Sequence, residues 1–306
     1  MIIPDDIAPE GHDDFDISVE DWRRLNAAPK FRRRLRNRIR AFRFLREPAA
    51  ETLMFNSEKA FSDAVIASVA FNRPDVIEWQ IHLVRRHVAE SKAYVVFDNS
   101  SREDARRAIR DLCKRRHVPY VGLPKNRMMV SASHGLALNW IVRNFISAFR
   151  PSLFGFLDHD IFPTAPFSVR RQMTGKLLYG RKRHDTPTPG GWFLWPGFSF
   201  FDGCLPLGQM DFSPSYRFHM DSGGGNWPVL YRSIDLNKVR FAETRWLRFG
   251  QGRDEYSDYF LFLDGWLHAG NASHWKQPST DRREQLLALL GRAGGPDQPN
   301  VNFEPL

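Results

Sequence analysis

Three observations predict that the chain folds as an α/β protein with an open, mostly parallel sheet flanked by helices. Short apolar runs rich in β-branched residues alternate with amphipathic helical segments. The alternation has the spacing of β-α-β units, which build parallel sheets. Successive runs also end in polar side chains, at Asn72, at Asp98 and Asn99, and at Asp158 and Asp160. Because ligands bind beyond the carboxyl ends of the strands in such sheets, these clusters predict a binding site at one edge.

The predicted elements follow one another in chain order: strand 64–71, helix 75–90, strand 93–101, helix 102–117, strand 118–124, helix 131–149 and strand 152–163. Most of these strands are continuous apolar runs, which is typical of strands buried on both faces. The helices carry apolar residues at spacings of three and four, as Val76, Trp79 and Leu83 show. The regularity fades after residue 165.

The later part of the chain is rich in glycine, proline and tryptophan, which predicts long, shaped loops. The segment 190–203, GGWFLWPGFSFFDG, carries several aromatic residues next to glycines. Aromatic faces there could pack against sugars or against hydrophobic acceptors. Phe198 and Phe200 fit a core strand equally well, whereas Trp195-Pro196-Gly197 is more typical of a loop.

Composition excludes several classes of protein. The chain has 306 residues, of which 42% are hydrophobic and 26% are charged, so it is neither disordered nor collagen-like. No apolar run has the roughly 18 residues that a spanning helix needs, and the acidic start does not resemble a secretory signal. Cys113 and Cys204 form no disulfide framework or metal-ligand spacing, which favours a reducing, cytoplasmic setting.

The net charge of +9 is concentrated near the N-terminus. Residues 1–21 carry eight acidic groups and no basic one, whereas residues 22–46 carry eleven Lys or Arg and no acid. Within 31–45, Phe31, Leu35, Ile39, Phe42 and Leu45 form one stripe of a basic amphipathic helix. Three roles are open for this helix. Its stripe could dock on the main domain, it could lie on an anionic membrane, or it could bind nucleic-acid phosphates.

Two carboxylates follow the strand at 153–157. Asp158 and Asp160 flank His159 at a turn, which could bring both side chains to one hard cation such as Mg²⁺ or Mn²⁺. The alternative is a solvated acidic turn, because a D-x-D pattern is common by chance.

Four segments together give this pair a context. They are SVAFNRP (68–74), VVFDNSS (95–101), SHGLALNW (133–140) and FLDHDIFP (156–163). In order and spacing they resemble the nucleotide-sugar-dependent glycosyltransferases of the GT-A type, especially the family-2-like ones. Ser133 departs from the pattern, because it stands where those enzymes commonly have an asparagine. The resemblance covers residues 63–165 and resumes weakly to about residue 275.

The resemblance implies a GT-A-like fold and a division of the chain. Residues 1–60 would be an acidic tail followed by the basic helical extension, and residues 61–280 would be the catalytic domain. Within that domain, 61–165 would bind the nucleotide and 166–280 the acceptor. Residues 281–306 would be a C-terminal tail.

Site residues are likewise implied by the resemblance. Ala70 and Asn72 would belong to the first nucleotide-binding loop, and Asp98 would contact the nucleoside of the donor beside Asn99. Asp158 would lie at the diphosphate.

The resemblance also implies a metal site. Asp160, together with Asp158, would bind the diphosphate of the donor through Mn²⁺ or Mg²⁺. His268, in HAGNAS (268–273), would complete the metal ligands, and His274 is the alternative ligand. The structural interpretation is that this residue is a loop histidine bonded to the backbone.

An inverting transfer also needs a general base that removes the proton of the acceptor hydroxyl. Asp221 is the candidate because the glycines of HMDSGGGNW (219–227) would let substrate approach the backbone. Asp202 and Asp211 remain alternatives, and a retaining enzyme would need no such base. The structural interpretation is that Asp221 caps a turn.

The expected function is therefore that of a metal-dependent glycosyltransferase of the hexosyltransferase type. It would move a sugar from a nucleotide-diphosphate sugar to an acceptor hydroxyl in cell-envelope polysaccharide or glycolipid synthesis. The acceptor would be a sugar or a lipid-linked molecule. The expected location is cytoplasmic, with peripheral association at the inner face of the membrane through residues 31–45. Two alternatives are a nucleotidyltransferase on a related fold and a non-catalytic sugar- or nucleic-acid-binding protein.

Overall fold

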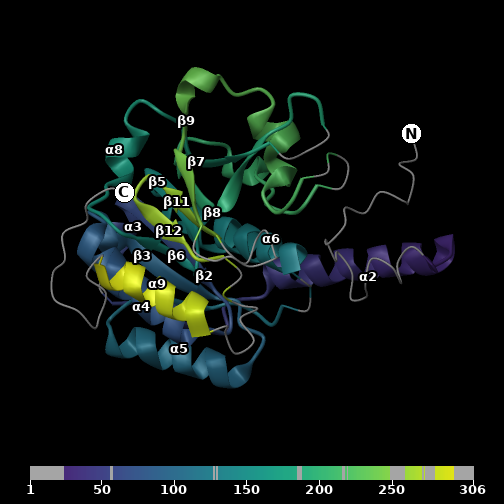
Figure 1. Cartoon of the computed structure of the whole chain (residues 1–306). Helices are drawn as coiled ribbons and strands as arrows, with labels where there is room; N and C mark the ends of the chain where they lie inside the picture. The colour runs from purple at the N-terminus through teal and green to yellow at the C-terminus, as the bar shows by residue number, and fades with distance from the viewer. Residues whose placement is uncertain are drawn as a thin grey trace.

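The structure is a computed structural model of the whole chain. It describes residues 24–55, 58–126, 128, 130–184, 188–215, 218, 220–248, 259–270, 272 and 280–292. A central eight-stranded sheet has the order β1-β4-β3-β2-β5-β8-β7-β9 (Figure 1). Its strands are β1 (Glu51–Leu53), β2 (Ala64–Ala70), β3 (Tyr94–Asp98), β4 (Tyr120–Gly122), β5 (Leu153–Asp158), β7 (Leu178–Arg183), β8 (Phe193–Asp202) and β9 (Val239–Phe241).

Parallel and antiparallel pairs both occur in this sheet. The pairs β4–β3, β3–β2, β2–β5 and β7–β9 are parallel, whereas β1 and β8 each run antiparallel to their neighbours. The predicted open α/β sheet is therefore confirmed as a mixed sheet with a parallel centre. Carboxyl ends of β2, β3 and β5 lie at the same edge because these three strands are parallel.

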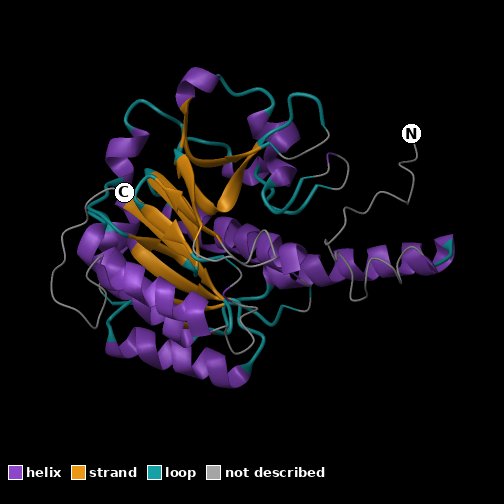
Figure 2. Cartoon of the chain, in the orientation of Figure 1, coloured by secondary structure: helices purple, strands orange, loops and turns teal. Residues whose placement is uncertain are grey.

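Helices cover both faces of the sheet (Figure 2). They are α2 (Ala27–Arg46), α3 (Glu58–Asp63), α4 (Pro74–His87), α5 (Glu103–Arg115), α6 (Val130–Ile141), α7 (Ser147–Phe149), α8 (Val169–Met173) and α9 (Thr280–Arg292). A π-helical turn, Val142–Ile146, joins α6 to α7. No helix in the described part of the chain is long and apolar enough to cross a membrane.

Strand β2 shows why the central strands of the sheet are continuous apolar runs in the sequence. Successive side chains of a strand point to opposite faces. Val65 and Ala67 pack in the core that contains Leu136 of α6, whereas Ile66 packs in the core that contains Ile81 of α4. Every residue of β2 is buried, so an apolar side chain is favoured at each position.

The strand predicted over 152–163 is two strands in two sheets. β5 ends at Asp158, and β6 (Ile161–Pro163) begins three residues later in a second, four-stranded antiparallel sheet. The other strands of that sheet are β10 (Thr244–Arg248), β11 (Tyr259–Leu263) and β12 (Trp266–His268), in the order β10-β11-β12-β6. The turn between β5 and β6 therefore holds His159 and Asp160 at the junction of the two sheets.

The loop predicted at Trp195-Pro196-Gly197 is part of strand β8. Its pairing with β7 nevertheless shifts, because Ser199 pairs with Gly180 and Leu194 pairs with Lys182. The residues between Leu194 and Ser199 thus form a bulge, which accommodates Pro196 because proline has no N–H to donate to the ladder.

The C-terminal half of helix α2 packs on the hydrophobic core of the domain. Phe44 is buried in the core, and Ala41 and Leu45 pack against it. Trp140 donates its indole N–H to the carbonyl oxygen of Glu47 at 2.9 Å. Most of the apolar stripe predicted for this helix does not dock on the domain, because Phe31, Leu35, Ile39 and Phe42 are 43–67% exposed.

Candidate active site

The candidate site lies where the carboxyl end of β5 meets the second sheet. Asp158 is the last residue of β5, Asp160 follows in the turn, and His268 ends β12. Strand β12 pairs with β6 so that His268 lies opposite Ile161. The ladder continues beyond the strands, because the amide of Ala269 donates to the carbonyl oxygen of Asp160 at 2.9 Å. Two segments more than 100 residues apart in the sequence are thus held side by side.

These three side chains form a compact donor cluster. One ligand atom from each of Asp158, Asp160 and His268 lies within 4.8 Å of the others. His268 Nε2 is 3.4 Å from Asp160 Oδ1, and the amide of Ala272 donates to Asp160 Oδ2 at 3.1 Å. Two carboxylate oxygens and one imidazole nitrogen are donors that suit Mn²⁺ or Mg²⁺. The residue types and their spacing therefore fit a divalent cation.

The two carboxylates differ in their electrostatics. Burial raises the pKa of Asp158, attraction from His134 opposes the rise, and the charge of Asp160 adds to it. Burial also acts to raise the pKa of Asp160, but attraction and a hydrogen bond from His268 outweigh it and lower that pKa. Asp160 thus stays ionised, whereas the charge of Asp158 is costly without a nearby cation. A divalent ion between them would remove that cost.

A second histidine, on helix α6, contacts the cluster. His134, in α6, places Nε2 3.3 Å from Asp158 Oδ1. Its Nδ1 lies 3.5 Å from the hydroxyl oxygen of Ser222, the residue after Asp221. Helix α6 and the loop at 220–224 are therefore both joined to Asp158.

Gln80 fixes the backbone of the turn that carries the carboxylates. This fully buried side chain of α4 donates from Nε2 to the carbonyl oxygens of Asp158 and Ile161, each at 2.7 Å. Its Oε1 accepts from Ser68 at 2.5 Å and from Tyr94 at 2.7 Å. All four hydrogen-bonding positions of the amide are in use, which holds the turn between β5 and β6 in one conformation.

The bulge of β8 forms one wall of the site. A Cβ at Gly197 would lie 2.5 Å from Asp158 Oδ2 and 2.2 Å from the indole of Trp195, so a side chain does not fit there. Trp195 also contacts the ring of His268, with 4.6 Å between ring centroids. The guanidinium of Arg181 lies over the ring of Trp195, 5.1 Å from the ring centroid.

The predicted nucleotide-binding residues lie together at the same edge of the sheet. Asn72 has a positive φ of 57°, and its side chain bonds to residues of the loop after β3. Ala70 is fully buried and accepts the amide of Asn99 at 3.0 Å. The Asn99 side chain donates to the hydroxyl of Ser133 at 3.1 Å. The two loops and the start of α6 are therefore joined into one surface.

Asp98 lies inside this edge and is not exposed. Its Oδ1 accepts the amide of Ser100 at 2.8 Å, and its Oδ2 accepts the hydroxyl of Tyr120 at 3.0 Å. Burial raises the pKa of Asp98, and the hydrogen bonds from Ser100 offset part of that rise. Both oxygens are engaged within the protein, so the carboxylate shapes the loop at 98–100.

The candidates for the general base lie in different places. Asp221 is half-buried, its Oδ1 accepts the amide of Ser222 at 2.5 Å, and Ser222 lies beside His134. Asp211 is exposed and accepts from the side chain of Asn139 at 2.8 Å. Asp202 pairs with Leu153 at the opposite end of β5 from Asp158. Of the three, Asp221 is the one whose neighbouring residue contacts the histidine at Asp158. His274 lies outside the described residues.

Sequence reasoning missed His134 and Gln80. His134 is in the segment SHGLALNW, and its position beside Ser133 was the available signal. Gln80 is a polar residue within the apolar stripe of α4, between Val76 and Leu83. A polar residue buried on a helix face needs partners, and that requirement was the available signal there.

Comparison with known proteins finds no protein-family model and no curated protein that matches the chain. Similar solved structures include three glycosyltransferases. Glucosyl-3-phosphoglycerate synthase from Mycobacterium tuberculosis, in complex with UDP, has 18% identity and a TM-score of 0.42 over 78% of this chain and 83% of that chain. Mannosyltransferase PcManGT from Pyrobaculum calidifontis, in complex with GDP-Man and Mn²⁺, has 15% identity and a TM-score of 0.41 over 70% of this chain and 63% of that chain.

The third is the bifunctional glycosyltransferase WbbM, with 14% identity and a TM-score of 0.39 over 59% of this chain and 38% of that chain. The chain thus spans less than two thirds of the length of WbbM and of PcManGT.

Proposed function

We propose that the chain is a metal-dependent glycosyltransferase that transfers a sugar from a nucleotide-diphosphate sugar to an acceptor hydroxyl. The observation that carries this proposal is the Asp158–Asp160–His268 cluster at the carboxyl edge of the sheet. Ligands bind at that edge in open α/β sheets. Asn72, Ala70 and Asn99 lie at the same edge and are proposed to border the nucleotide.

Asp158, Asp160 and His268 are proposed to hold Mn²⁺ or Mg²⁺. A bound divalent cation would neutralise charge on the departing diphosphate. The chain prepares the site through fixed geometry: Gln80 holds the turn, Gly197 leaves space beside Asp158, and His134 contacts the carboxylate. Asp98 is proposed to act on the nucleoside of the donor through the loop at 98–100, which its hydrogen bonds shape.

Asp221 is proposed as the general base of an inverting transfer. The acceptor oxygen forms a bond to the anomeric carbon, the bond from that carbon to the diphosphate breaks, and Asp221 takes the hydroxyl proton. The support is its place beside Ser222 and His134 at the edge of the cluster. The acceptor is proposed to be a sugar or lipid-linked molecule of the cell envelope.

A donor screen tests the reaction. UDP, GDP, dTDP and CDP sugars are incubated with the full chain and Mn²⁺ or Mg²⁺, and released nucleotide and sugar are measured. We expect metal-dependent release of a nucleoside diphosphate from one donor class and loss of release in Asp160→Asn, with Glu103→Gln as the matched control on α5. Release of sugar 1-phosphate in place of a nucleoside diphosphate would instead indicate nucleotidyl transfer. Unchanged turnover in Asp160→Asn would refute the metal assignment.

A second pair of variants tests the base. Asp221→Asn should lose transfer to an acceptor while it keeps nucleotide binding, and Asp211→Asn should keep both. Loss of transfer in Asp211→Asn alone would move the base to that residue.

A further inference from the structure

Helix α2 presents an apolar stripe to solvent. At about 100° per residue, Phe31, Leu35, Ile39 and Phe42 fall within about 80° of one another. Their exposed fractions are 67%, 49%, 43% and 54%. Phe44, which is buried at 4%, lies roughly 180° around the helix from them. The stripe is therefore a second face of the helix, distinct from the face that packs on the domain.

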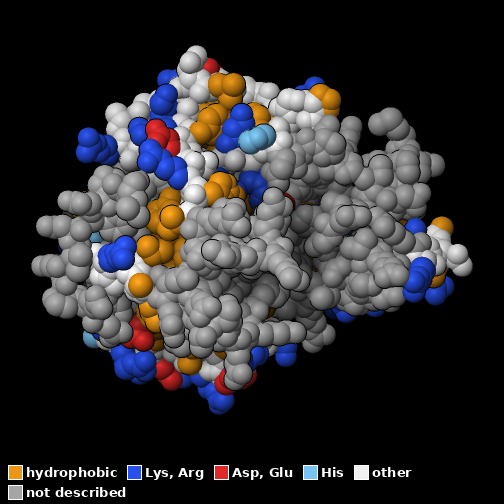
Figure 3. All heavy atoms as spheres, viewed as in Figure 1, with side chains coloured by type: hydrophobic (Ala, Val, Ile, Leu, Met, Phe, Trp, Pro, Cys, Tyr) orange, Lys and Arg blue, Asp and Glu red, His pale blue; other side chains and the backbone are white. Residues whose placement is uncertain are grey.

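The stripe extends beyond the body of the molecule. The 20 residues of α2 make a helix about 30 Å long. Figure 1 shows its N-terminal half projecting past α6, and Figure 3 shows blue and orange side chains at that end of the molecule. The contacts with the hydrophobic core lie at the other end, around Ala41, Phe44 and Leu45, and the side chains of Lys30 and Asn37 are also buried.

Cations border the stripe on both sides. The helix carries nine Lys or Arg and no Asp or Glu. By the same rotation per residue, Arg38 lies on one side of the stripe, and Arg32 and Arg43 lie on the other. Arg46 lies over the ring of Phe42, 3.9 Å from its centroid. An apolar face edged by guanidinium groups is the arrangement of helices that lie in the interface of an anionic membrane.

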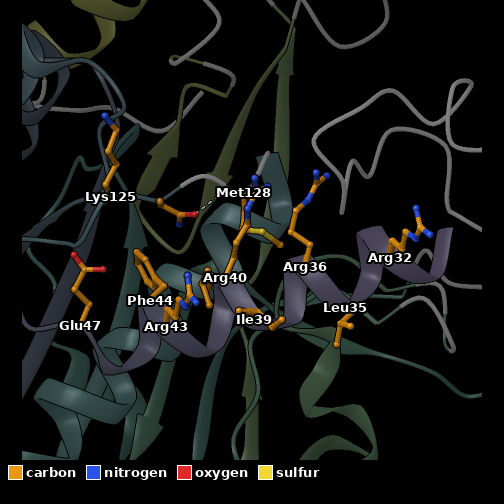
Figure 4. A pocket seen from close by; sticks show the side chains of 12 residues that line it. Arg32, Leu35, Arg36, Ile39, Arg40, Arg43, Phe44, Glu47, Lys125 and Met128 are labelled. Carbon is orange, nitrogen blue, oxygen red and sulfur yellow. Dashed lines mark hydrogen bonds between the residues drawn. The ribbon is translucent and has the colours of Figure 1, made fainter. Parts of the chain in front are cut away.

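A basic groove of about 580 Å³ lies between α2 and α6, and Leu35 and Ile39 of the stripe are among the residues that line it. Figure 4 shows Arg32 and Arg36 pointing to one side of α2 and Leu35 to the other. The cations that line the groove are Arg32, Arg36, Arg40, Arg43 and Lys125. Among the described residues, the only acidic one that lines it is Glu47. Asn126, which also lines the groove, donates to the side chain of Asn99 at 3.1 Å. The groove therefore reaches the edge of the sheet that carries the proposed donor site.

We propose that α2 docks the protein on an anionic phospholipid bilayer, with Phe31, Leu35, Ile39 and Phe42 among the acyl chains and the bordering arginines at lipid phosphates. Leu and Ile in the stripe suit acyl chains, whereas nucleic-acid phosphates would leave them in water. A second copy would bring a second set of nine like charges against the first. This docking does not depend on the proposed transfer reaction.

Vesicle flotation of the full chain tests the docking. The two vesicle types are phosphatidylcholine alone and phosphatidylcholine with about one third phosphatidylglycerol. We expect binding to the anionic vesicles, little binding to phosphatidylcholine alone, and release at high salt because screening weakens the attraction to lipid phosphates. Equal binding to both vesicle types, or binding to neither, would overturn the proposal.

Two double variants separate the apolar and basic contributions. Phe31→Ser with Leu35→Ser should weaken vesicle binding by at least about tenfold, and Arg38→Gln with Arg43→Gln by about 30-fold. The matched controls are Val229→Ser with Leu236→Ser, whose side chains are 41% and 58% exposed, and Arg107→Gln with Arg115→Gln on α5. The controls should bind as the wild type does.

Other outcomes identify other occupants and overturn the proposal. Vesicle binding at the wild-type level by both α2 variants would overturn the proposal. Binding of the full chain to a mixed-sequence RNA without binding to vesicles would also overturn it. A lipid-free dimer that Phe31→Ser with Leu35→Ser dissociates would assign the stripe to a second copy. Donor hydrolysis in detergent-free buffer should be the same in all these variants, so failure of docking and failure of the proposed activity are distinguishable.

Discussion

At the residue scale, the four hydrogen bonds of Gln80 make it the most constrained polar side chain near the site. Replacing it with Met keeps its volume but leaves Ser68, Tyr94 and two backbone carbonyl groups without their partner. We expect Gln80→Met to lower the free energy of unfolding by about 2–4 kcal/mol. Urea unfolding measures this, with the exposed Gln209→Met as control. A loss in Gln80→Met no larger than in the control would contradict the constraint.

Asp98 provides a pH-dependent test. Its folded pKa is raised by burial, so its ionised form costs stability above that pKa. As pH falls through the folded pKa toward the unfolded value of about 3.9, the folded state takes up the proton first and gains stability. Wild-type stability should therefore rise relative to Asp98→Asn as pH falls over this window. Melting temperatures of both proteins across pH measure it, and a constant or opposite difference would count against it.

Single residues were predictable where a motif carried them. Asp158, Asp160 and His268 could be named from short segments, and the structure brings them together. His134 and Gln80 act through contacts with a β5 turn that lies 24 and 78 residues further along the chain. Local sequence carries no information about such distant partners, so their roles required the fold.

At the element scale, the bulge of β8 has a testable consequence. Gly197→Ala would place a Cβ 2.5 Å from Asp158 Oδ2, so the carboxylate or the strand must shift. We expect Mn²⁺ affinity to fall by about tenfold or more, as for residues that orient metal ligands. Calorimetric titration with Mn²⁺ measures the change. Gly208→Ala is the control because nothing lies within 4 Å of its added Cβ; equal affinities in the two variants would show that the bulge does not position Asp158.

Elements were predictable where burial gives a simple pattern. The apolar runs that became β2, β3 and β5 are buried on both faces. A turn at His159 and Asp160 was predicted, but a separate strand in a different sheet was not, because Ile161 and Phe162 continue the apolar run. The strand at Trp195–Gly197 was missed because a proline and a glycine favour a loop. These residues form the bulge of β8, and the strand is set by the pairing of Leu194 and Ser199 on either side of it with β7.

At the scale of the whole molecule, the site depends on the meeting of two sheets. The parallel sheet supplies Asp158 and the edge beside β2 and β3, and the antiparallel sheet supplies His268 through the β6–β12 pair. α4 joins them, because Val76 and Leu83 pack in a core with Phe162 and Leu267. The parallel direction of the central strands followed from the alternating pattern, whereas the second sheet joins strands distant in sequence and could not be predicted from it.

The central claim is that this junction binds a nucleoside diphosphate through a divalent cation. Calorimetric titration of UDP, GDP, dTDP and CDP into the full chain, with and without Mn²⁺ or Mg²⁺, tests it most directly. The account predicts that at least one nucleotide binds only when the cation is present, and that Asp160→Asn weakens this binding at least about tenfold. Absence of binding for all four with either cation, or unchanged binding in Asp160→Asn, would contradict it.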